Sequence, residues 1–233
     1  MAHSITRVLV VVAHPDDAEF GCGGTVAKWV KEGREVVYVI LTNGDKGSAE
    51  RSMTSERLAR VRAEEQLSAA RTLGVERVEF LGYPDGELED THEVRRAVTA
   101  QIRRYRPDLV VTQNPHRTAN LYASHRDHRV AGGVVLDCAY PLARDHLSFP
   151  ELVAQGLEPH KVREVYLMWG EQADVVVDIS DTLELKLKAL ACHTSQMNDF
   201  ALVEARVRER AGQLGKPKGY AYAETFNRIL IPR

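Results

Sequence analysis

The stretch VLVVVAHPDDAEFGCGGT, residues 8–25, joins an apolar segment directly to a polar turn. Its first five residues are Val or Leu, a run typical of a strand that is covered on both faces of a parallel sheet. His14, Asp16 and Asp17 follow where the chain leaves that strand, and Pro15 stiffens the turn. A histidine and two carboxylates at the end of a buried strand point to chemistry at this edge of a sheet.

Strand and helix patterns alternate along the chain. Runs of β-branched and apolar residues predict strands over 7–13, 35–42, 77–84, 108–113, 163–169 and 173–180. Helical spacing predicts helices over 25–32, 55–73, 127–138 and 182–191, and a further helix that carries Val94, Val98 and Ile102 and ends at Pro107. Residues 141–159 have no clean period. This order predicts an α/β chain: a three-layer Rossmann-like fold with a mostly parallel sheet and helices on both faces, as a single domain over 1–233.

Composition narrows the function classes. The chain has 233 residues, 44% of them hydrophobic, and a formal net charge of -2. Charges of both signs are interspersed, which argues against a nucleic-acid partner or a membrane-surface anchor. No run approaches the length of a membrane span or a signal peptide, so we expect a cytoplasmic protein. Cys22, Cys138 and Cys192 are odd in number and form no CxxC pair, which favours reduced thiols over disulfides or a thiolate zinc site.

Polar side chains follow each of the first four predicted strands. Ligands in folds of this type bind outside the carboxyl ends of the strands. The segments at those ends are AHPDD (13–17), TNGDKGS (42–48), YPDGELED (83–90) and QNPHRTANLYASHRDH (113–128). The sequence therefore predicts a functional site at this edge.

Two His-Asp clusters supply a candidate metal site. A set drawn from His14, Asp17 and His128 gives three ligands and leaves a position open for water, as catalytic zinc requires. His125 and His128 are three residues apart and share a face if this segment opens a helix. Asp16, left uncoordinated, is placed to take a proton from the water. We therefore expect Zn²⁺ as the cofactor.

Other interpretations of the same residues stay open. His14 and Asp16 with the distant His128 also fit the facial triad of a non-haem iron oxygenase, although those enzymes usually have an all-β scaffold. The runner-up of a different class is a non-catalytic, metal-containing sugar-binding module. Each cluster taken alone could be ordinary polar surface.

The glycines in this stretch do not form a dinucleotide-binding loop. Gly21, Gly23 and Gly24 follow an acidic turn rather than the strand, and Thr25 stands where a third glycine might be sought. We interpret them as permitting a tight turn and close packing of a helix on the sheet.

Taken together, the motifs resemble the PIG-L/LmbE-like family of zinc-dependent N-deacetylases, which act on N-acetylglucosamine-type sugars. The likeness spans most of the chain and is carried by AHPDDAEFGCGGT, RAEEQLSAARTLGV, YPDGEL, RPDLVVT, SHRDH and ALACHTSQ. It implies that the zinc ligands are His14, Asp17 and His128. It further implies Asp16 as the general base and His125 as the histidine that stabilises the oxyanion or protonates the leaving amine.

The resemblance also implies that Arg62 and Asp85 hold the sugar. From the residues alone, Arg62 could instead lie on a solvated helix face or pair with Glu65. His193 follows the predicted 182–191 helix and could reach a sugar or a neighbouring subunit's pocket, or have a capping or core role. Asp127 could orient a neighbouring imidazole or simply favour the start of a helix.

The chain departs from the family pattern at two places. Ala18 separates the HPDD motif from Glu19, and Ala123 replaces the tyrosine often found two residues before His125, with Tyr122 displaced by one position. The expected partner is an N-acetylated sugar or conjugate; the family often forms oligomers, so a homo-oligomer is possible, but the sequence leaves the oligomeric state open.

Overall fold

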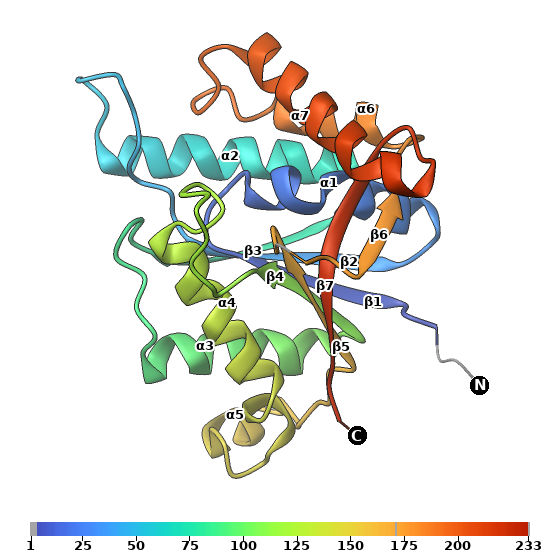
Figure 1. The fold of residues 1–233 in the computed structure, drawn as a ribbon. Coiled ribbons are helices and arrows are strands. Elements are labelled where there is room, and N and C mark those ends of the chain that lie inside the picture. The colour runs from blue at the N-terminus through green and yellow to red at the C-terminus, as the bar shows by residue number, and fades with distance from the viewer. Residues whose placement is uncertain (1–3, 171, 233) are drawn as a thin grey trace.

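The structure is a computed structural model that describes residues 4–170 and 172–232 (Figure 1). Strands and helices alternate through most of the chain, as predicted. The strands are β1 Arg7–Val12, β2 Glu35–Thr42, β3 Arg77–Tyr83, β4 Leu109–Gln113, β5 Glu164–Met168, β6 Val175–Asp178 and β7 Ala223–Leu230. The helices are α1 Asp17–Lys31, α2 Ser55–Leu73, α3 His92–Tyr105, α4 Arg126–Ala139, α5 Pro150–Ala154, α6 Leu183–Leu190 and α7 Phe200–Gly215.

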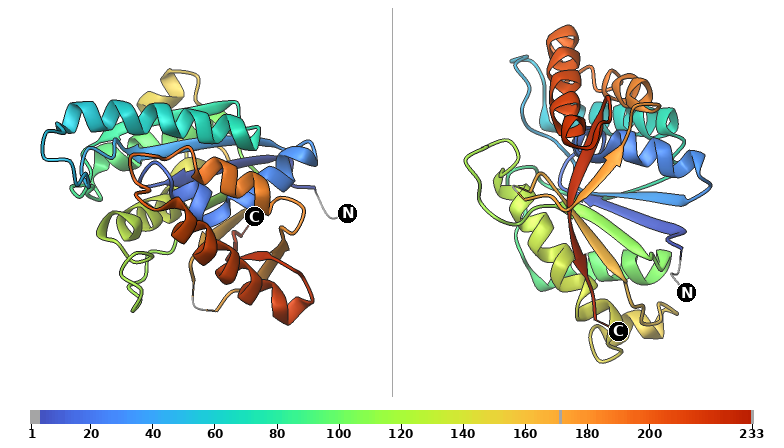
Figure 2. Two further views of the ribbon diagram at one scale, coloured as in Figure 1. Left: turned by 90° about the horizontal axis from the view of Figure 1, so that it is seen from above. Right: turned by 45° about the vertical axis from the view of Figure 1, so that its right-hand side comes forward.

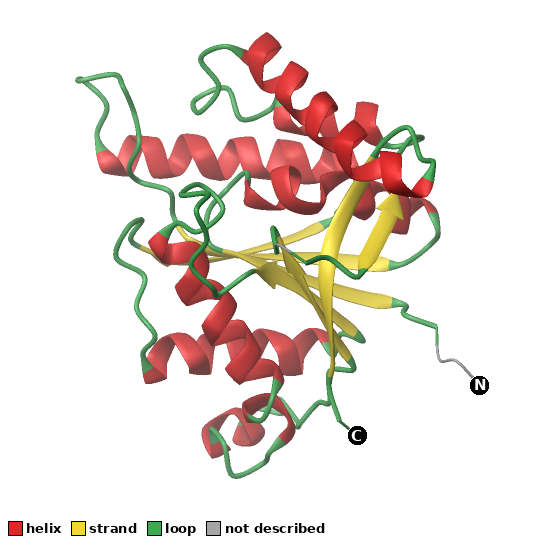
Figure 3. Ribbon diagram, in the orientation of Figure 1, coloured by secondary structure: helices red, strands yellow, loops and turns green. Residues whose placement is uncertain are grey.

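The strands form one seven-stranded mixed sheet in the order β3-β2-β1-β4-β5-β7-β6 (Figure 3). Strands β1 to β5 run parallel, and β7 is antiparallel to both β5 and β6. The register places Val10 of β1 between Tyr38 of β2 and Val111 of β4. The predicted α/β fold with a mostly parallel sheet is confirmed; the single domain over 1–233 stays a prediction.

Helices cover both faces of the sheet (Figures 1 and 2). Alternate residues of β1 serve the two faces: Val10 and Val12 belong to the core under α1 and α2, and Leu9 and Val11 to the core under α3 and α4. Because side chains alternate along a strand, a strand buried on both sides must be apolar at nearly every position. This explains the unbroken VLVVV run.

Helix α1 begins earlier than predicted. The sequence pattern indicates a start at residue 25, whereas the helix starts at Asp17 and contains a break at Cys22, where φ is -146° and ψ is 15°. The glycines therefore lie inside the helix rather than in a turn. A Cβ on Gly21 would meet Met168 Sδ at 2.2 Å, and one on Gly24 would meet Ile179 Cδ1 at 2.8 Å. The predicted close packing is correct, and the tight turn is not.

Two regions without a clear sequence pattern also form structure. The 141–159 segment contains α5 and is held by the buried guanidinium of Arg103, which donates to the carbonyl oxygens of Asp145 and Ser148, each at 2.7 Å. Beyond residue 191 the sequence predicts no element, yet α7 packs on β7 and β7 lies within the sheet.

Two expectations from composition can be compared with the fold. Cys22, Cys138 and Cys192 are unpaired, and the first two are buried. Across residues 4–170 and 172–232, no helix combines the length and apolarity needed to cross a membrane.

Candidate active site

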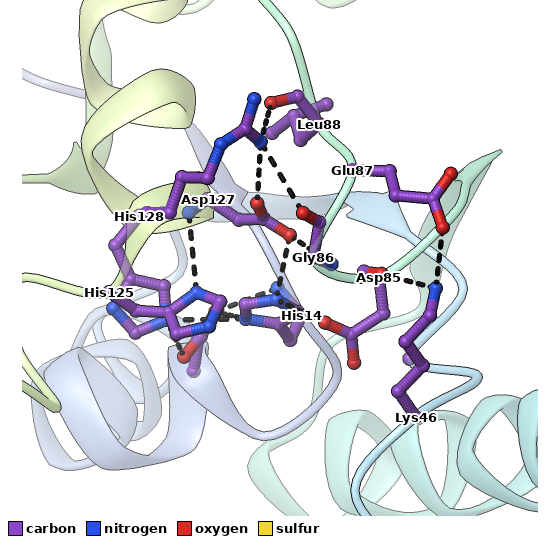
Figure 4. A network of polar contacts seen from close by, with 12 residues as sticks. His14, Lys46, Asp85, Gly86, Glu87, Leu88, His125, Asp127 and His128 are labelled. Carbon is purple, nitrogen blue, oxygen red and sulfur yellow. Dashed lines mark hydrogen bonds and ion pairs between the residues drawn. The ribbon is translucent and has the colours of Figure 1, made fainter.

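The two His-Asp clusters meet at the carboxyl edge of the sheet (Figure 4). His14 follows β1, and His128 lies in the first turns of α4, which follows β4. Although these histidines are 114 positions apart in the sequence, His14 Nδ1 lies 3.2 Å from His128 Nε2. The parallel sheet brings the two motifs together because successive strands end at the same edge.

The three predicted metal ligands form a compact triangle of donor atoms. His14 Nδ1 and His128 Nε2 are 3.2 Å apart. Asp17 Oδ2 lies 3.3 Å from His14 Nδ1, and Asp17 Oδ1 lies 3.0 Å from His128 Nε2. Three ligands at about 2.1 Å from one tetrahedral ion lie about 3.4 Å from one another. Two imidazoles and one carboxylate at these separations fit a borderline divalent ion such as zinc.

Other polar groups orient these donors. Asp17 Oδ2 accepts hydrogen bonds from Gln113 Nε2 at 2.8 Å and from the His14 backbone N–H at 2.7 Å. The far nitrogen of His14, Nε2, faces Asp127 Oδ2 at 3.3 Å and Asp85 Oδ1 at 3.2 Å. A carboxylate behind a ligating imidazole fixes the tautomer and the ring orientation. The geometry thus agrees with Asp127 as an acceptor for a neighbouring imidazole.

Carboxylates dominate the electrostatics of this cluster. Burial acts to lower the pKa of His14, but hydrogen bonds to Asp127, Asp17 and Asp85 raise it well above its usual value. Burial likewise acts to raise the pKa of Asp17, yet His128 and His14 hold it far below its usual range. A divalent ion bound at these donors would require the His14 and His128 nitrogens that face it to be deprotonated.

Asp16 stands apart from the donor triangle. Its carboxylate Oδ2 lies 3.4 Å from Arg62 Nη2, and 16% of its side chain is exposed. Burial raises the pKa of Asp16 to about 6; Arg62 opposes this shift and Asp17 adds to it. This carboxylate is accessible to a water molecule and close to the metal donors without being held by them.

His125 is the exposed histidine of the site. Its ring lies 5.1 Å from that of His14, and its Nδ1 accepts the Asp127 backbone N–H at 3.2 Å as the N-cap of α4. Burial lowers the pKa of His125, and His14 and His128 lower it further. Because Nδ1 accepts this hydrogen bond, Nε2 is the ring nitrogen left to carry a proton.

Two further donor groupings occur around His14. Its ring, with those of His125 and His128, offers nitrogen atoms within 4.8 Å of one another, and so do the donor atoms of His14, Asp85 and Asp127. His14 is thus common to every candidate set.

Arg62 lies beneath the site rather than on a solvated face. Only 4% of the residue is exposed, and its Nη2 donates to Pro15 O at 2.8 Å. Its Nη1 lies 3.7 Å from Asp85 Oδ2. The alternative of a pair with Glu65 is wrong, because that carboxylate accepts instead from the Ser195 N–H at 2.7 Å.

His193 does not reach the site surface. It is 0% exposed, and its Nε2 lies 3.3 Å from Glu19 Oε2. The prediction that His193 contacts a sugar or a neighbouring subunit's pocket disagrees with this burial, and the core alternative describes it. Tyr122, by contrast, is almost fully exposed.

Sequence reasoning missed three residues at the site. Trp169 follows β5 with φ at 61°, and its ring lies 5.2 Å from that of His128. Trp169 is the last residue of the predicted 163–169 strand, and β5 ends one residue earlier, so a search at the end of that strand would have found it. Gln113 ends β4 and holds Asp17, and Gln66 follows Arg62 by one helical turn and contacts Asp16.

Comparison with known proteins gives concordant results. Residues 9–139 match the family PIG-L, described as GlcNAc-PI de-N-acetylase. The chain is 35% identical over 224 residues to a diacetylchitobiose deacetylase from Thermococcus kodakarensis, covering 95% of this chain and 82% of the relative. It is 27% identical to a 1D-myo-inositol 2-acetamido-2-deoxy-alpha-D-glucopyranoside deacetylase from Mycobacterium sp. (strain KMS), over 85% of this chain and 76% of the relative. The solved structure of N,N'-diacetylchitobiose deacetylase from Pyrococcus horikoshii, in complex with its inhibitor MPG, superposes with a TM-score of 0.92 at 33% identity, over 97% of this chain and 85% of that one.

Proposed function

This chain belongs to the PIG-L family of de-N-acetylases, and we propose that it hydrolyses the acetamide of an N-acetylglucosamine-type sugar with the help of a zinc ion. The observation that carries the proposal is the donor triangle of His14, Asp17 and His128, with atoms 3.0 to 3.3 Å apart, beside an uncoordinated carboxylate. Zinc in such a site supplies Lewis acidity, which polarises a carbonyl oxygen and favours deprotonation of water near neutral pH.

Asp16 is the proposed general base. Its carboxylate faces Arg62 rather than the donor triangle, so it is free to take a proton from a water that attacks the acetamide carbon. The same orientation argues against the oxygenase alternative, in which Asp16 would have to join His14 and His128 as a ligand.

His125 is the proposed donor to the oxygen on which charge develops. Because its Nδ1 accepts the Asp127 N–H, Nε2–H is the atom available to a substrate. Loss of one donor to such an oxygen typically costs about 100- to 1000-fold in rate. Burial, His14 and His128 lower the pKa of His125, which favours the neutral form of the ring.

The resemblance implies that both Arg62 and Asp85 hold the sugar, but their exposure supports different roles for the two residues. Asp85 keeps 13% of its side chain exposed beside His14, which suits a contact with a sugar hydroxyl. Arg62 is 5% exposed in its side chain and is engaged by Pro15 and Asp85, so we propose that it acts by holding those groups. The predicted homo-oligomer and cytoplasmic location stay predictions.

The relatives indicate where to look for the substrate. The relative from Thermococcus kodakarensis is named for diacetylchitobiose and covers 95% of this chain, so we propose that disaccharide as the first substrate to test. Free N-acetylglucosamine and an inositol glycoside of N-acetylglucosamine complete a panel that shares the acetamide and differs in the aglycone.

The test is release of free amine from this panel by protein of measured metal content. We expect release that disappears after chelation and returns with stoichiometric zinc, and a His128→Ala variant that binds no zinc and stays inactive. Binding of the sugars without turnover would favour the non-catalytic sugar-binding module. Stoichiometric zinc in the His128→Ala variant would reject the ligand set.

A further inference from the structure

Residues 14–17 form a turn whose third position is occupied by Asp16. The Asp17 N–H donates to His14 O at 3.4 Å, and Asp16 has φ 87° and ψ -23°. These angles match the third position of a type II turn, with Pro15 at the second. That position normally takes glycine because φ is positive, although aspartate tolerates it better than most residues. The carboxylate proposed as the general base is thus presented from an uncommon backbone conformation.

Helix α2 holds the central peptide of this turn at both ends. Pro15 O accepts from Arg62 Nη2 at 2.8 Å, and the Asp16 N–H donates to Gln66 Oε1 at 2.9 Å. Arg62 and Gln66 are four residues apart and therefore lie on one face of the helix. In the type I turn the same peptide is rotated by about 180°, so neither hydrogen bond could form. The two side chains therefore select the observed turn.

The orientation of the Gln66 amide is fixed by a second hydrogen bond, to Glu19. Gln66 Nε2 donates to Glu19 Oε1 at 2.9 Å, and both residues are 0% exposed. Since the NH₂ group must face this carboxylate, the carbonyl oxygen is left to accept from Asp16. Glu19 is in turn flanked by His193, whose Nε2 lies 3.3 Å from Oε2. This gives Glu19 and His193 a place in the site although neither reaches its surface.

We propose that Gln66, oriented by Glu19, is a positioning residue that holds Asp16 in its left-handed conformation and so aims the catalytic carboxylate. The proposal rests on the function proposed above, in which Asp16 is the base. Gln66 hydrogen-bonds to the Asp16 N–H and to Glu19, not to the donor atoms of His14 and Asp17 at the two ends of the same turn. Asp17 keeps its own hydrogen bonds from Gln113 and the His14 N–H, so loss of Gln66 should lower turnover while leaving the metal bound.

The first test compares Gln66→Met, which preserves length but removes the amide, with Gln101→Met as a matched control. Gln101 is also a buried helical glutamine, but it lies on α3, on the opposite face of the sheet, and its amide oxygen accepts from Arg104. We expect Gln66→Met to lower kcat by about 10- to 100-fold, the scale reported for small misplacements of catalytic groups, with KM changed less than about twofold. Zinc content should stay stoichiometric, and a crystal structure should show Asp16 outside the left-handed region. Gln101→Met should keep the wild-type kcat.

The second test exchanges the two side chains. In the Gln66→Glu/Glu19→Gln variant, the amide at position 19 can donate to a carboxylate at position 66, which again accepts the Asp16 N–H, and the total charge is unchanged. Recovery of kcat in the exchanged variant to within about threefold of wild type supports the proposal. A loss of kcat in the exchanged variant equal to that of Gln66→Met overturns it. A Gln66→Met variant that is fully active and keeps the turn intact also overturns it. If wild-type protein releases no amine while the turn in Gln66→Met still rearranges, the proposed function fails and the structural hold on Asp16 stands.

Discussion

Two buried charged clusters contact helix α1, and they differ in how their charged side chains are engaged. The first, here called the site cluster, comprises His14, Asp17, Asp85, Asp127 and His128. The second is the Lys186–Glu224 pair, which joins α6 to β7 beneath the break in α1. Both are almost completely removed from solvent. Burial of charge alone therefore does not distinguish a reactive site from a structural element.

The Lys186–Glu224 pair is balanced and fully engaged. Lys186 Nζ contacts Glu224 Oε1 at 2.6 Å and Phe20 O at 2.8 Å. Glu224 also accepts from the backbone N–H groups of Gly24 at 3.0 Å and Thr25 at 2.7 Å, which open the second part of α1 after the break. One cation meets one anion, and the carboxylate caps a helix start. Such an arrangement needs no further ligand.

The site cluster consists of ligand-type side chains, and the arginines Arg62 and Arg126 pair with Asp85 and Asp127 at its outer side. Three carboxylates converge on two imidazoles, and the pKa of His14 and of His128 is raised as a result. For His128, burial opposes the rise and Asp17 causes it. The donor atoms of His14, Asp17 and His128 face one another at 3.0 to 3.3 Å, whereas those of the Lys186–Glu224 pair are engaged by each other and by backbone groups. Comparison of the two clusters thus teaches that convergence of ligand-type donor atoms, more than burial of charge, marks the metal site.

The largest expected effect is on turnover, in an Asp16→Asn variant. An amide of the same shape cannot accept the proton from water, so we expect kcat to fall by about 100- to 10,000-fold, the usual contribution of a general base. Zinc stoichiometry and thermal stability should match wild type because Asp16 lies outside the donor triangle. The measurement is amine release with zinc determined on the same sample. Glu87→Gln, on the exposed rim of the site where Glu87 pairs with Lys46, is the matched control and should keep full activity. Full activity in Asp16→Asn would remove Asp16 as the base.

The next effect is on stability, in a Lys186→Met variant of the balanced pair. It leaves Glu224 charged and buried without its cation, so we expect a loss of about 3 to 5 kcal/mol in the free energy of unfolding. Zinc stoichiometry and kcat per folded molecule should not change. Urea denaturation measures the loss, with Lys28→Met as control, because the Lys28–Glu32 pair at 3.5 Å is exposed and should contribute less than about 1 kcal/mol. A loss of zinc in Lys186→Met would show that the two clusters are coupled.

The sequence predicts the elements whose patterns are local and strong. Strands β1, β2 and β4 are recognisable because they are buried on both faces and consist mostly of β-branched residues. Strand β7 escapes this criterion: its AETFNRIL sequence mixes Glu224 and Arg228 with apolar residues, and its far end is exposed. Its place between β5 and β6 depends on antiparallel pairing over a long separation in the chain. The start of α1 is missed because Gly21, Gly23 and Gly24, which lie inside the helix, are typical of a turn.

The residues of the site likewise fall into those that the sequence predicts and those that it does not. Strand ends bring His14, Asp17 and His128 together, so knowledge of the topology is sufficient to predict their proximity. The roles of Arg62 and His193 depend on which face each element turns inward, and a charged helix or an isolated histidine does not reveal this. Gln66 lies within the RAEEQLSAARTLGV stretch, but nothing in that stretch distinguishes it; only its contact with the Asp16 N–H reveals its role.

The smallest expected effect concerns a further buried carboxylate, Asp108, at the opposite edge of the sheet. Its Oδ2 accepts from the Thr6 N–H at 3.0 Å, the Arg7 N–H at 3.1 Å and the Thr6 hydroxyl at 3.0 Å. Burial acts to raise the pKa of Asp108, but these hydrogen bonds lower it below its usual value.

Asp108 should therefore behave like the balanced pair and not like the site cluster. Because the folded pKa is below the unfolded value of about 3.9, the charged carboxylate stabilises the fold above that pH, and this contribution is lost as the pH falls through the folded pKa. We expect Asp108→Asn to lower the free energy of unfolding at pH 7 by about 1 kcal/mol, the difference between charged and neutral hydrogen bonds, with kcat unchanged. Urea denaturation of both proteins from pH 7 to pH 3 should show the gap between them closing below about pH 4. A gap that stays constant over this range would mean that the charge of Asp108 contributes nothing, and that its hydrogen bonds act through geometry alone.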